Sequence, residues 1–582
     1  MIKFRFVLFS ISFHILIILL VKSINSIQNG KKIGAYISTP NPDNLQYRTG
    51  NGIGGIGNGW DDGRLSNLSS WGGYDGQRKK LPDYHLSYWG YGIELGDCET
   101  NTKCGILDVV GYLCGPSEVH SSKRLTPYSN SNREIQPPAN LYEPIWLKNG
   151  SVNPNNYWAD YINKTVSLYK SHIKIWETWN EPDYTRNYGV VDKWKTEPPS
   201  QDDLISWHGT IFEYIRLLRI TYEVAKKADP TCWVATGGLG YTSFLDAILR
   251  YTDNPKDGSV TDEYPALGGA YFDCDAYHQY PQYGVTDEET GEGYHDNGSD
   301  TLAKKVVILG KNHHYTIKKY GFGKEYPDKI FINTETGYEN GDTKEKNLIR
   351  RNWIIKLALY QIEYDVKQIH SLYLSDSGIK GMGDFENIGQ YVSVEEGFKH
   401  LKDSSKGRLI LKKMNIGKFI FDEKKTKEFR QSLPEGMTGI VLKRKFPKVE
   451  NEAYYVKNIY SVWLNCIKEE IGGEINYQLN LSFDPLLIDW EGKEKNIGKN
   501  SMISITSTPI FLLGNIEEDE ENSENSENSE NSKTSGFVVF LEVVGIILLI
   551  VILAIVGLYC YKKYIKKKYV PIDKNFFSSL LK

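Results

Sequence analysis

The hydrophobic pattern of this chain changes its period repeatedly between residues 83 and 376. Short runs with apolar side chains at alternate positions predict buried strands, and longer runs with apolar side chains three and four residues apart predict helices. Because the two kinds of run alternate, we expect a parallel sheet covered by helices. The predicted strands cover residues 84–95, 106–114, 173–179, 232–238, 272–280, 329–335 and 369–376, and the predicted helices cover 156–169, 202–228, 243–251, 302–320 and 342–364.

Eight such strand–helix units would close into a barrel. The sequence therefore predicts an α/β protein with a (β/α)8 TIM barrel over residues 27–395. Residues 27–80 are rich in Gly, Asn and Asp and are predicted to form a turn-rich entry segment. A phosphate-binding loop is the alternative for their glycine run, but no Lys-Ser or Lys-Thr pair follows it.

The pattern changes after residue 395. Helical periodicity fades, and short alternating stretches replace it. Such stretches are typical of a β-sandwich, which we expect over residues 396–515. The stretches that carry this prediction are 408–411, 437–443, 453–464, 475–483 and 501–513, with residues 504–512 as the closing strand.

The N-terminus resembles a targeting segment rather than part of the fold. Lys3 and Arg5 precede a long apolar stretch, and small polar residues follow it. This order is typical of a secretory signal peptide, which we place at residues 1–26. An uncleaved anchor is the alternative, because the apolar stretch is long for a signal peptide.

The C-terminus has the pattern of a membrane anchor. Residues 516–535 form an acidic, low-complexity stalk, 536–561 form an apolar transmembrane helix, and 562–582 form a basic cytoplasmic tail. Positive residues on the far side of the helix place the tail in the cytosol. We therefore expect a single-pass type I protein of the cell membrane, with the main body extracellular or lumenal.

Composition narrows the chemistry. A net charge of −4 gives no basic surface for nucleic acid, and 13% aromatic residues would suit either sugar binding or large aromatic cores. The cysteine and histidine spacing suggests no metal site, so neither a metal nor a cofactor is expected. Of the cysteines, Cys98 and Cys104 are the easiest disulfide pair to expect, while Cys232 and Cys274 look like buried thiols.

Candidate catalytic residues lie at the ends of two predicted strands. The first strand stops at Asn180, Glu181 and a proline, and the second carries Glu335 just before a glycine. In a parallel barrel, both strand ends would lie on the catalytic face. Two carboxylic acids there suit glycoside hydrolysis, with one as proton donor and the other as nucleophile or base. A lone Asn-Glu-Pro could equally be a loop acid near a turn.

The motifs around these acids resemble those of a known group of enzymes. Trp179-Asn180-Glu181-Pro182 and Thr334-Glu335-Thr336-Gly337 are similar to the motifs of clan A glycoside hydrolases, which are retaining (β/α)8 enzymes. Residues 176–183 are most like family 39, the alpha-L-iduronidases and beta-xylosidases. The resemblance implies that Glu181 is the acid/base and Glu335 is the nucleophile, with the two carboxyl groups roughly 5–5.5 Å apart.

The resemblance also implies a set of substrate-binding residues. Asn180 matches the residue that hydrogen-bonds the sugar 2-hydroxyl, and His278 and Tyr280 match a pair on the sixth strand, whose Tyr hydroxyl bonds the nucleophile. His278 alone could instead be a structural histidine. Trp179 could form an apolar wall beside the acid. Tyr373 stands near the place where the clan often has a tryptophan, and His85 and Arg64 are candidates for its basic residue on the second strand.

The expected function follows from these residues. We expect a retaining glycoside hydrolase that acts on an oligo- or polysaccharide through a covalent glycosyl-enzyme and is anchored at the cell surface. One alternative is an inactive glycan-binding receptor or adhesion protein, although a binder needs neither acid. Another is a transglycosylase that remodels cell-surface glycans.

Overall fold

The computed structural model describes the central part of the chain. Several predictions fall outside the described residues: the signal peptide at 1–26, the stalk at 516–535, the transmembrane helix at 536–561, the basic tail at 562–582, the Cys98–Cys104 pair, and Tyr373, His85 and Arg64. Among the helices that the structure does describe, none is both long and apolar enough to cross a membrane. The described residues are 45–51, 76–82, 108–127, 129, 132, 135–338, 343–371, 403–447 and 453–514.

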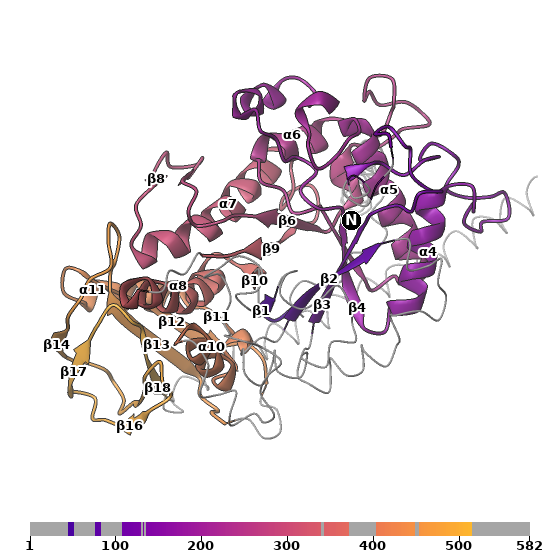
Figure 1. The fold of residues 1–582 in the computed structure, drawn as a ribbon. Helices are drawn as coiled ribbons and strands as arrows, with labels where there is room; N and C mark the ends of the chain where they lie inside the picture. The colour runs from indigo at the N-terminus through magenta and orange to yellow at the C-terminus, as the bar shows by residue number, and fades with distance from the viewer. Residues whose placement is uncertain are drawn as a thin grey trace, which may run out of the picture. The chain divides into compact units, whose positions relative to one another are not determined.

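Eight parallel strands close into a barrel in the order β1-β10-β9-β6-β5-β4-β3-β2 (Figure 1). The predicted parallel barrel is thus confirmed. The prediction of a turn-rich segment over residues 27–80 is corrected, because β1 and most of β2 lie within those residues. The barrel strands are β1 (Arg48–Asn51), β2 (Gly76–Pro82), β3 (Asp108–Cys114), β4 (Ile173–Thr178), β5 (Trp233–Ala235), β6 (Cys274–His278), β9 (Ile330–Thr336) and β10 (Val366–Ser371).

Helices connect the strands from β3 onward, as the hydrophobic periods predicted. The predicted helix at 202–228 begins later than expected, because Thr210 caps it: its hydroxyl accepts from Glu213 N, and the Glu213 carboxylate accepts from Thr210 N. The helices are α4 (Tyr157–Tyr169), α5 (Ile211–Ala228), α6 (Thr242–Arg250), α7 (Ser299–Lys319) and α8 (Lys344–Glu363), with 3₁₀ turns η4 (Tyr188–Lys195), η5 (Gln201–Asp203) and η6 (Gly268–Tyr271), and a β7–β8 hairpin (Val285–Thr286, Gly293–Tyr294).

The barrel interior changes character along its axis. Apolar side chains, among them Ile175 and Ile332, fill the part toward the strands' amino ends. Two residues further along the same strands, Glu177 and Thr334 are buried and hydrogen-bonded to each other. Because strand side chains alternate between two faces, these polar residues point into the barrel like the apolar pair before them. The carboxyl end of the barrel is therefore lined by charge.

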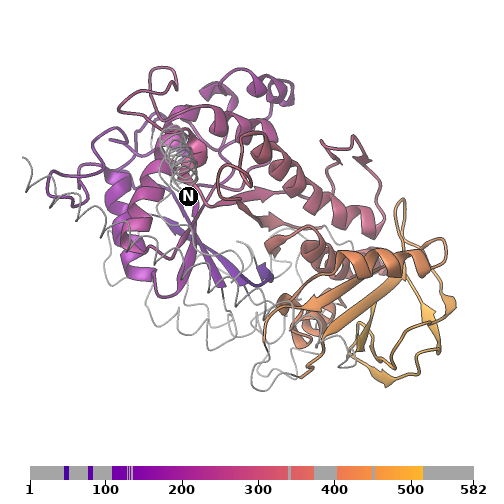
Figure 2. The same ribbon diagram turned by 180° about the vertical axis from the view of Figure 1, so that it is seen from behind.

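The residues after 402 form two antiparallel sheets with an apolar core between them (Figure 2). The alternating stretch predicted at 408–411 is corrected, because these residues lie in helix α10. Their consecutive apolar residues fit a helix face as well as a strand. The predicted closing strand is two strands, one in each sheet. The six-stranded sheet is β11 (Phe419–Phe421), β12 (Met437–Arg444), β13 (Asn458–Leu464), β18 (Ile510–Gly514), β15 (Leu486–Ile488) and β16 (Glu494–Asn496); β14 (Ile475–Gln478) pairs with β17 (Met502–Ile505); the helices are α10 (Asp403–Lys413) and α11 (Glu423–Ser432), with a 3₁₀ turn η7 (Ile416–Lys418).

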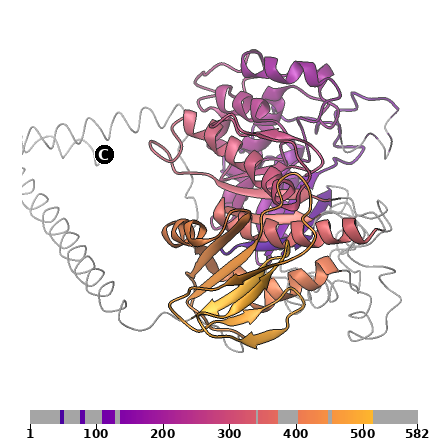
Figure 3. The ribbon, with the colours of Figure 1, turned by 90° about the vertical axis from the view of Figure 1, so that its left-hand side faces the viewer.

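The larger sheet lies beside the barrel helices, as the turned view in Figure 3 shows. Polar side chains bind it to these helices. Asp300 of α7 is buried and accepts hydrogen bonds from Lys356 Nζ at 2.7 Å, Trp463 Nε1 at 2.8 Å and Tyr360 Oη at 2.7 Å. We call Asp300 and these three donors the junction network. The barrel and the two sheets that follow it therefore belong to one compact unit.

Candidate active site

Glu181 is placed by an unusual stretch of backbone at the end of β4. Trp179 and Glu181 have φ of +77° and +46°, values that residues other than glycine rarely adopt. Hydrogen bonds hold both residues there: Trp179 N donates to Leu113 O at 2.9 Å, and Glu181 N donates to Gly237 O at 2.6 Å. Backbone strain of this kind persists only where the surroundings impose it, and it is common at active sites.

Glu335 lies near the end of β9 and is held by two donors. The Tyr280 hydroxyl donates to Oε1 at 2.5 Å, and Arg78 Nη1 donates to Oε2 at 3.1 Å. Both contacts stabilise negative charge on the carboxylate. The predicted contact between Tyr280 and Glu335 is thus present.

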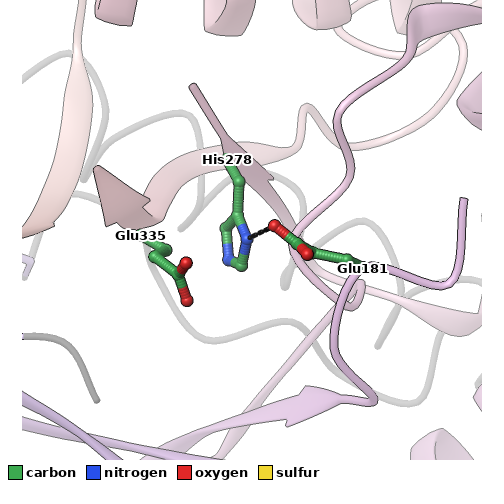
Figure 4. A group of neighbouring side chains, drawn as sticks. All are labelled: Glu181, His278 and Glu335. Carbon is green, nitrogen blue, oxygen red and sulfur yellow. Dashed lines mark hydrogen bonds and ion pairs between the residues drawn. The ribbon is translucent and has the colours of Figure 1, made fainter. Parts of the chain in front are cut away.

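The two predicted acids face each other (Figure 4). An oxygen of Glu181, an oxygen of Glu335 and a ring nitrogen of His278 all lie within 4.8 Å of one another. The side chain of Glu181 is 29% exposed and that of Glu335 is 15% exposed, so both reach solvent at the barrel mouth. A gap this short matches the separation expected of a retaining pair rather than the wider one of an inverting pair.

His278 contacts the acid that is predicted to donate a proton. Its Nδ1 lies 2.9 Å from Glu181 Oε1, and its Nε2 lies 3.0 Å from Thr334 Oγ1. Burial lowers the pKa of His278 to about 4, so the ring is neutral at neutral pH. Burial also raises the pKa of Glu181, and the nearby charge of Arg78 only partly opposes this effect. The environment therefore favours the protonated form of Glu181.

Arg78 and Glu177 are functional candidates that the sequence patterns did not identify. Both side chains are fully buried, and Arg78 Nε and Nη2 donate to the Glu177 carboxylate at 2.6 and 2.8 Å. Arg78 Nη2 also donates to Asn180 Oδ1 at 2.8 Å. Arg78 lies on β2, the strand on which the resemblance implies a basic residue. One signal was present in the sequence: the alternation in β4 turns Glu177 inward, where a carboxylate needs a cation.

Two glycines after β5 leave room for this arrangement. Gly238 has a φ of +64°, and a Cβ there would clash with the His278 ring. A Cβ on Gly237 would clash with the backbone of Thr178. Asp183 holds the same loop, because its carboxylate accepts from Gly240 N and Tyr241 N, both at 2.8 Å. Burial raises the pKa of Asp183 to about 7.

The structure corrects the predicted role of Trp179. Its side chain is fully buried, packs edge-on against Trp207 and donates from Nε1 to Ser206 O. The left-handed backbone at this residue turns the indole into the helical layer instead of the barrel mouth. Trp179 therefore supports Glu181 from beneath and has no surface for a sugar. Asn180, by contrast, is partly exposed beside the two acids.

Tyrosine side chains lie in the loops that follow Glu181 and His278. Tyr184 is 41% exposed, Tyr188 is 67% exposed, and Tyr283 is 63% exposed. Tyr184 N donates to Glu181 O at 3.1 Å, and Tyr283 N donates to Tyr280 O at 3.0 Å. Both exposed rings therefore stand a few residues from the candidate catalytic groups. Cys232 and Cys274 are buried free thiols, as predicted.

Two carboxylates and a histidine could in principle offer ligands to a metal ion. The charge distribution argues against that use. The guanidinium of Arg78 already lies against Glu335, and His278 Nδ1 is directed at Glu181. The three groups form a hydrogen-bonded acid–base arrangement beside a permanent cation, which would repel a second one.

Comparisons with known proteins find distant structural relatives. No family model matches the chain, and no curated protein sequence matches it. A family 39 glycoside hydrolase from Bacteroides cellulosilyticus WH2 is 14% identical, with 82% of each chain covered and a TM-score of 0.49. A GH30 endoxylanase from Clostridium papyrosolvens C71 is 11% identical, covering 81% of this chain and 98% of its own, with a TM-score of 0.45. A family 44 xyloglucanase from Paenibacillus polymyxa is 12% identical, covering 82% and 98%, with a TM-score of 0.41. These neighbours are glycoside hydrolases, but at such identities and scores they assign neither a family nor a substrate.

Proposed function

We propose that the protein is a retaining glycoside hydrolase that cleaves O-glycosidic bonds through a covalent glycosyl-enzyme. The observation that carries the proposal is the pairing of Glu181 and Glu335, whose oxygens lie within 4.8 Å at the mouth of one barrel. Their environments differ in the way that this mechanism requires. Burial raises the pKa of the Glu181 carboxyl group, and the Glu335 carboxylate accepts hydrogen bonds from two donors.

The first step needs an acid and a nucleophile. Glu181 gives its proton to the glycosidic oxygen as the bond from that oxygen to the anomeric carbon breaks. An oxygen of Glu335 bonds to the same carbon and forms an ester. Tyr280 and Arg78 orient the carboxylate, because Tyr280 donates to Oε1 of Glu335 and Arg78 donates to Oε2.

The second step uses the same groups in reverse. Water attacks the anomeric carbon, its proton passes to Glu181, and the ester bond to Glu335 breaks. When Glu335 becomes an ester it loses its negative charge while Arg78 keeps its positive one. The field at Glu181 then favours the carboxylate, which is the form that accepts the proton from water.

The exposed tyrosines support a carbohydrate substrate. Tyr184 and Tyr188 follow Glu181 in the chain, and both rings are exposed. Flat aromatic rings pack against the apolar faces of sugars, and a hydroxyl at the ring edge adds a hydrogen-bond partner. Asn180, held by Arg78, is placed to donate its amide hydrogens to a sugar hydroxyl.

Replacement of the two acids tests the proposal. The full-length chain is first screened against aryl glycosides and polysaccharides for a substrate. Glu335→Gln should lower kcat by about 10⁴-fold or more. Glu181→Ala should spare activated aryl glycosides, and azide should rescue it to give a glycosyl azide of retained configuration. Glu118→Gln, at an exposed glutamate, is the control. Wild-type turnover by both acid variants would refute the proposal.

We also propose that the enzyme is held at the cell surface by residues 536–561. Support for this anchoring comes from the apolar run and the basic residues after it. The chain should remain in the membrane pellet after an alkaline carbonate wash, and a chain ending at residue 515 should be released. Product analysis with an added sugar acceptor separates hydrolysis from transglycosylation.

A further inference from the structure

Glu177 is a buried carboxylate in the barrel that the proposed reaction does not use. It has no exposed surface and accepts hydrogen bonds from Arg78 and from Thr334 Oγ1, the latter at 2.8 Å. The same Thr334 oxygen lies 3.0 Å from His278 Nε2, and His278 Nδ1 lies 2.9 Å from Glu181. A continuous chain of hydrogen bonds therefore joins Glu177 to the proposed proton donor.

The direction of each bond in this chain follows from the groups themselves. A carboxylate held by the two-pronged contact of Arg78 can only accept, so the hydroxyl hydrogen of Thr334 points to Glu177. The Thr334 oxygen is then left as an acceptor, and His278 Nε2 must carry the hydrogen that lies between them. In a neutral ring, Nδ1 then has a free lone pair, and that lone pair faces Glu181.

On this basis, and resting on the proposed function, we propose that Glu177 is a positioning residue that acts through the Thr334 hydroxyl. It fixes the His278 ring with its hydrogen on Nε2, so that Nδ1 accepts the acidic hydrogen of Glu181. The resting enzyme thus stores its catalytic proton in one defined hydrogen bond. No group in this chain of hydrogen bonds is oxidised or reduced, and the number of protons that it holds is unchanged.

The stored bond has a consequence for each step of the reaction. When Glu181 gives its proton to the leaving oxygen, the new carboxylate faces the lone pair of His278 Nδ1. Two acceptors at this distance repel each other, so the pair gains by taking up a proton again. The source of that proton is the attacking water. His278 would therefore promote the return of Glu181 to its acidic form without itself changing charge.

Other charged groups also surround this pair. Burial lowers the pKa of His278 and the negative charge of Glu335 opposes this effect, while the positive charge of Arg78 lowers the pKa further and the negative charge of Glu177 raises it. These groups come from several strands, so only a change that leaves them all in place isolates the hydrogen-bond chain. Among the described residues, the titratable groups that act on Glu181 or His278 include Arg78 on β2, Glu177 on β4, Asp183 after β4, Tyr241 after β5 and Glu335 on β9, and Tyr280 after β6 contacts Glu335.

Thr334→Val provides that isolated change. It removes the hydroxyl that joins Glu177 to His278 and keeps the shape of the side chain and the Arg78 pair. Thr334→Ser restores a hydroxyl. Thr178→Val is the matched control, because Thr178 is a buried threonine on β4 whose hydroxyl has no partner within the described part of the chain. Glu177→Gln is less suitable, because it also removes one anion from Arg78.

The first measurement is the protonation of the His278 ring in the full-length chain with ¹⁵N-labelled histidine. His278 signals are identified by their loss in His278→Gln. At pH 7 the wild type, Thr334→Ser and Thr178→Val should show hydrogen on Nε2 and none on Nδ1, and Thr334→Val should lose this single form. Hydrogen on Nδ1 in the wild type would overturn the proposal even if Thr334→Val failed to fold.

The second measurement is the pH dependence of kcat/KM on the confirmed substrate. The loss of activity at high pH reports Glu181, and Thr334→Val should move it down by about one pH unit, the effect of one hydrogen bond. The low-pH limb should stay in place, and Thr334→Ser should restore the wild-type profile. An equal shift in Thr178→Val, or none in Thr334→Val, would overturn the proposal. The ring measurement needs no turnover, so it stands apart from the test with Glu335→Gln.

Discussion

Two buried ionic networks in this protein are built from similar groups and end differently. In the junction network, Lys356 and Asp300 are 0% and 1% exposed, and the bonds of the carboxylate stay within the protein. In the barrel mouth, Arg78 and Glu177 are equally buried. Arg78 also contacts Glu335, and hydrogen bonds through Thr334 and His278 connect Glu177 to Glu181; both of these outer acids reach solvent. The first network is closed and holds two parts of the fold together. The second is open and carries the influence of buried charges to two acids that a substrate could touch.

Asp300→Ala should give the largest effect, and on stability. The substitution leaves the buried Lys356 ammonium without an anion, which should lower the free energy of unfolding by about 3–5 kcal/mol. Urea denaturation measures this change, and kcat/KM of the folded protein should stay at the wild-type value. The control is Asp192→Ala, because the Lys195–Asp192 pair is 53% and 90% exposed and should contribute about 0.5 kcal/mol at most. A loss of activity in folded Asp300→Ala would remove the distinction between the networks.

Arg78→Lys should give the next largest effect, and on catalysis. Lysine keeps the charge but cannot bond Glu177 in a fork while also reaching Glu335 and Asn180. Loss of one charged hydrogen bond of about 1.5–3 kcal/mol should lower kcat by about 10- to 100-fold. Steady-state kinetics measures this effect. The control is Arg124→Lys, which changes a fork to Glu213 outside the mouth. Unchanged kcat in Arg78→Lys would mean that the network at the barrel mouth has a structural role, like the junction network, and no catalytic one.

Asp183→Asn should act on stability only as a function of pH. Burial raises the pKa of Asp183 from 3.8 to about 7 in the folded protein. Its contribution to stability is therefore complete below about pH 4 and is lost as the pH rises through about 7. The wild type should lose up to about 1.4 kcal/mol per pH unit from this group. Asparagine still accepts hydrogen bonds from Gly240 N and Tyr241 N, and the variant should not lose this stability as the pH rises. Chemical denaturation between pH 4 and 8 tests this, and parallel curves would contradict it.

The two catalytic candidates could be predicted from the sequence because local patterns specify them. The apolar alternation of β4 and β9 marks each strand, and the residues that stop each strand leave Glu181 and Glu335 at its end. The contact of Tyr280 with Glu335 followed from the family resemblance, whereas the contact of His278 with Glu181 was not predicted. In these cases the position along one strand determined the position in the barrel.

Arg78 could not be predicted in the same way. Its strand, β2, reads Gly-Gln-Arg-Lys-Lys-Leu-Pro, which is polar and shows no apolar alternation. What buries this arginine is a carboxylate from another strand, and a pattern of hydrophobic residues cannot report an ion pair across a barrel. The predicted role of Trp179 was wrong for a related reason, since the direction of its side chain depends on a φ of +77° that three-dimensional contacts impose.

Arg78 is permanently charged, and its balance with the neighbouring carboxylates determines the net charge of the barrel mouth. With Glu181 protonated, one arginine faces the carboxylates of Glu177 and Glu335, which leaves a surplus of one negative charge at rest. A sugar that develops positive charge as its bond breaks would be stabilised by that surplus. When the ester forms, the surplus charge moves from Glu335 to Glu181, which has given its proton to the leaving oxygen. The cleft thus keeps one negative charge through the first step, and a ring with a protonated nitrogen would bind there better than the sugar it imitates.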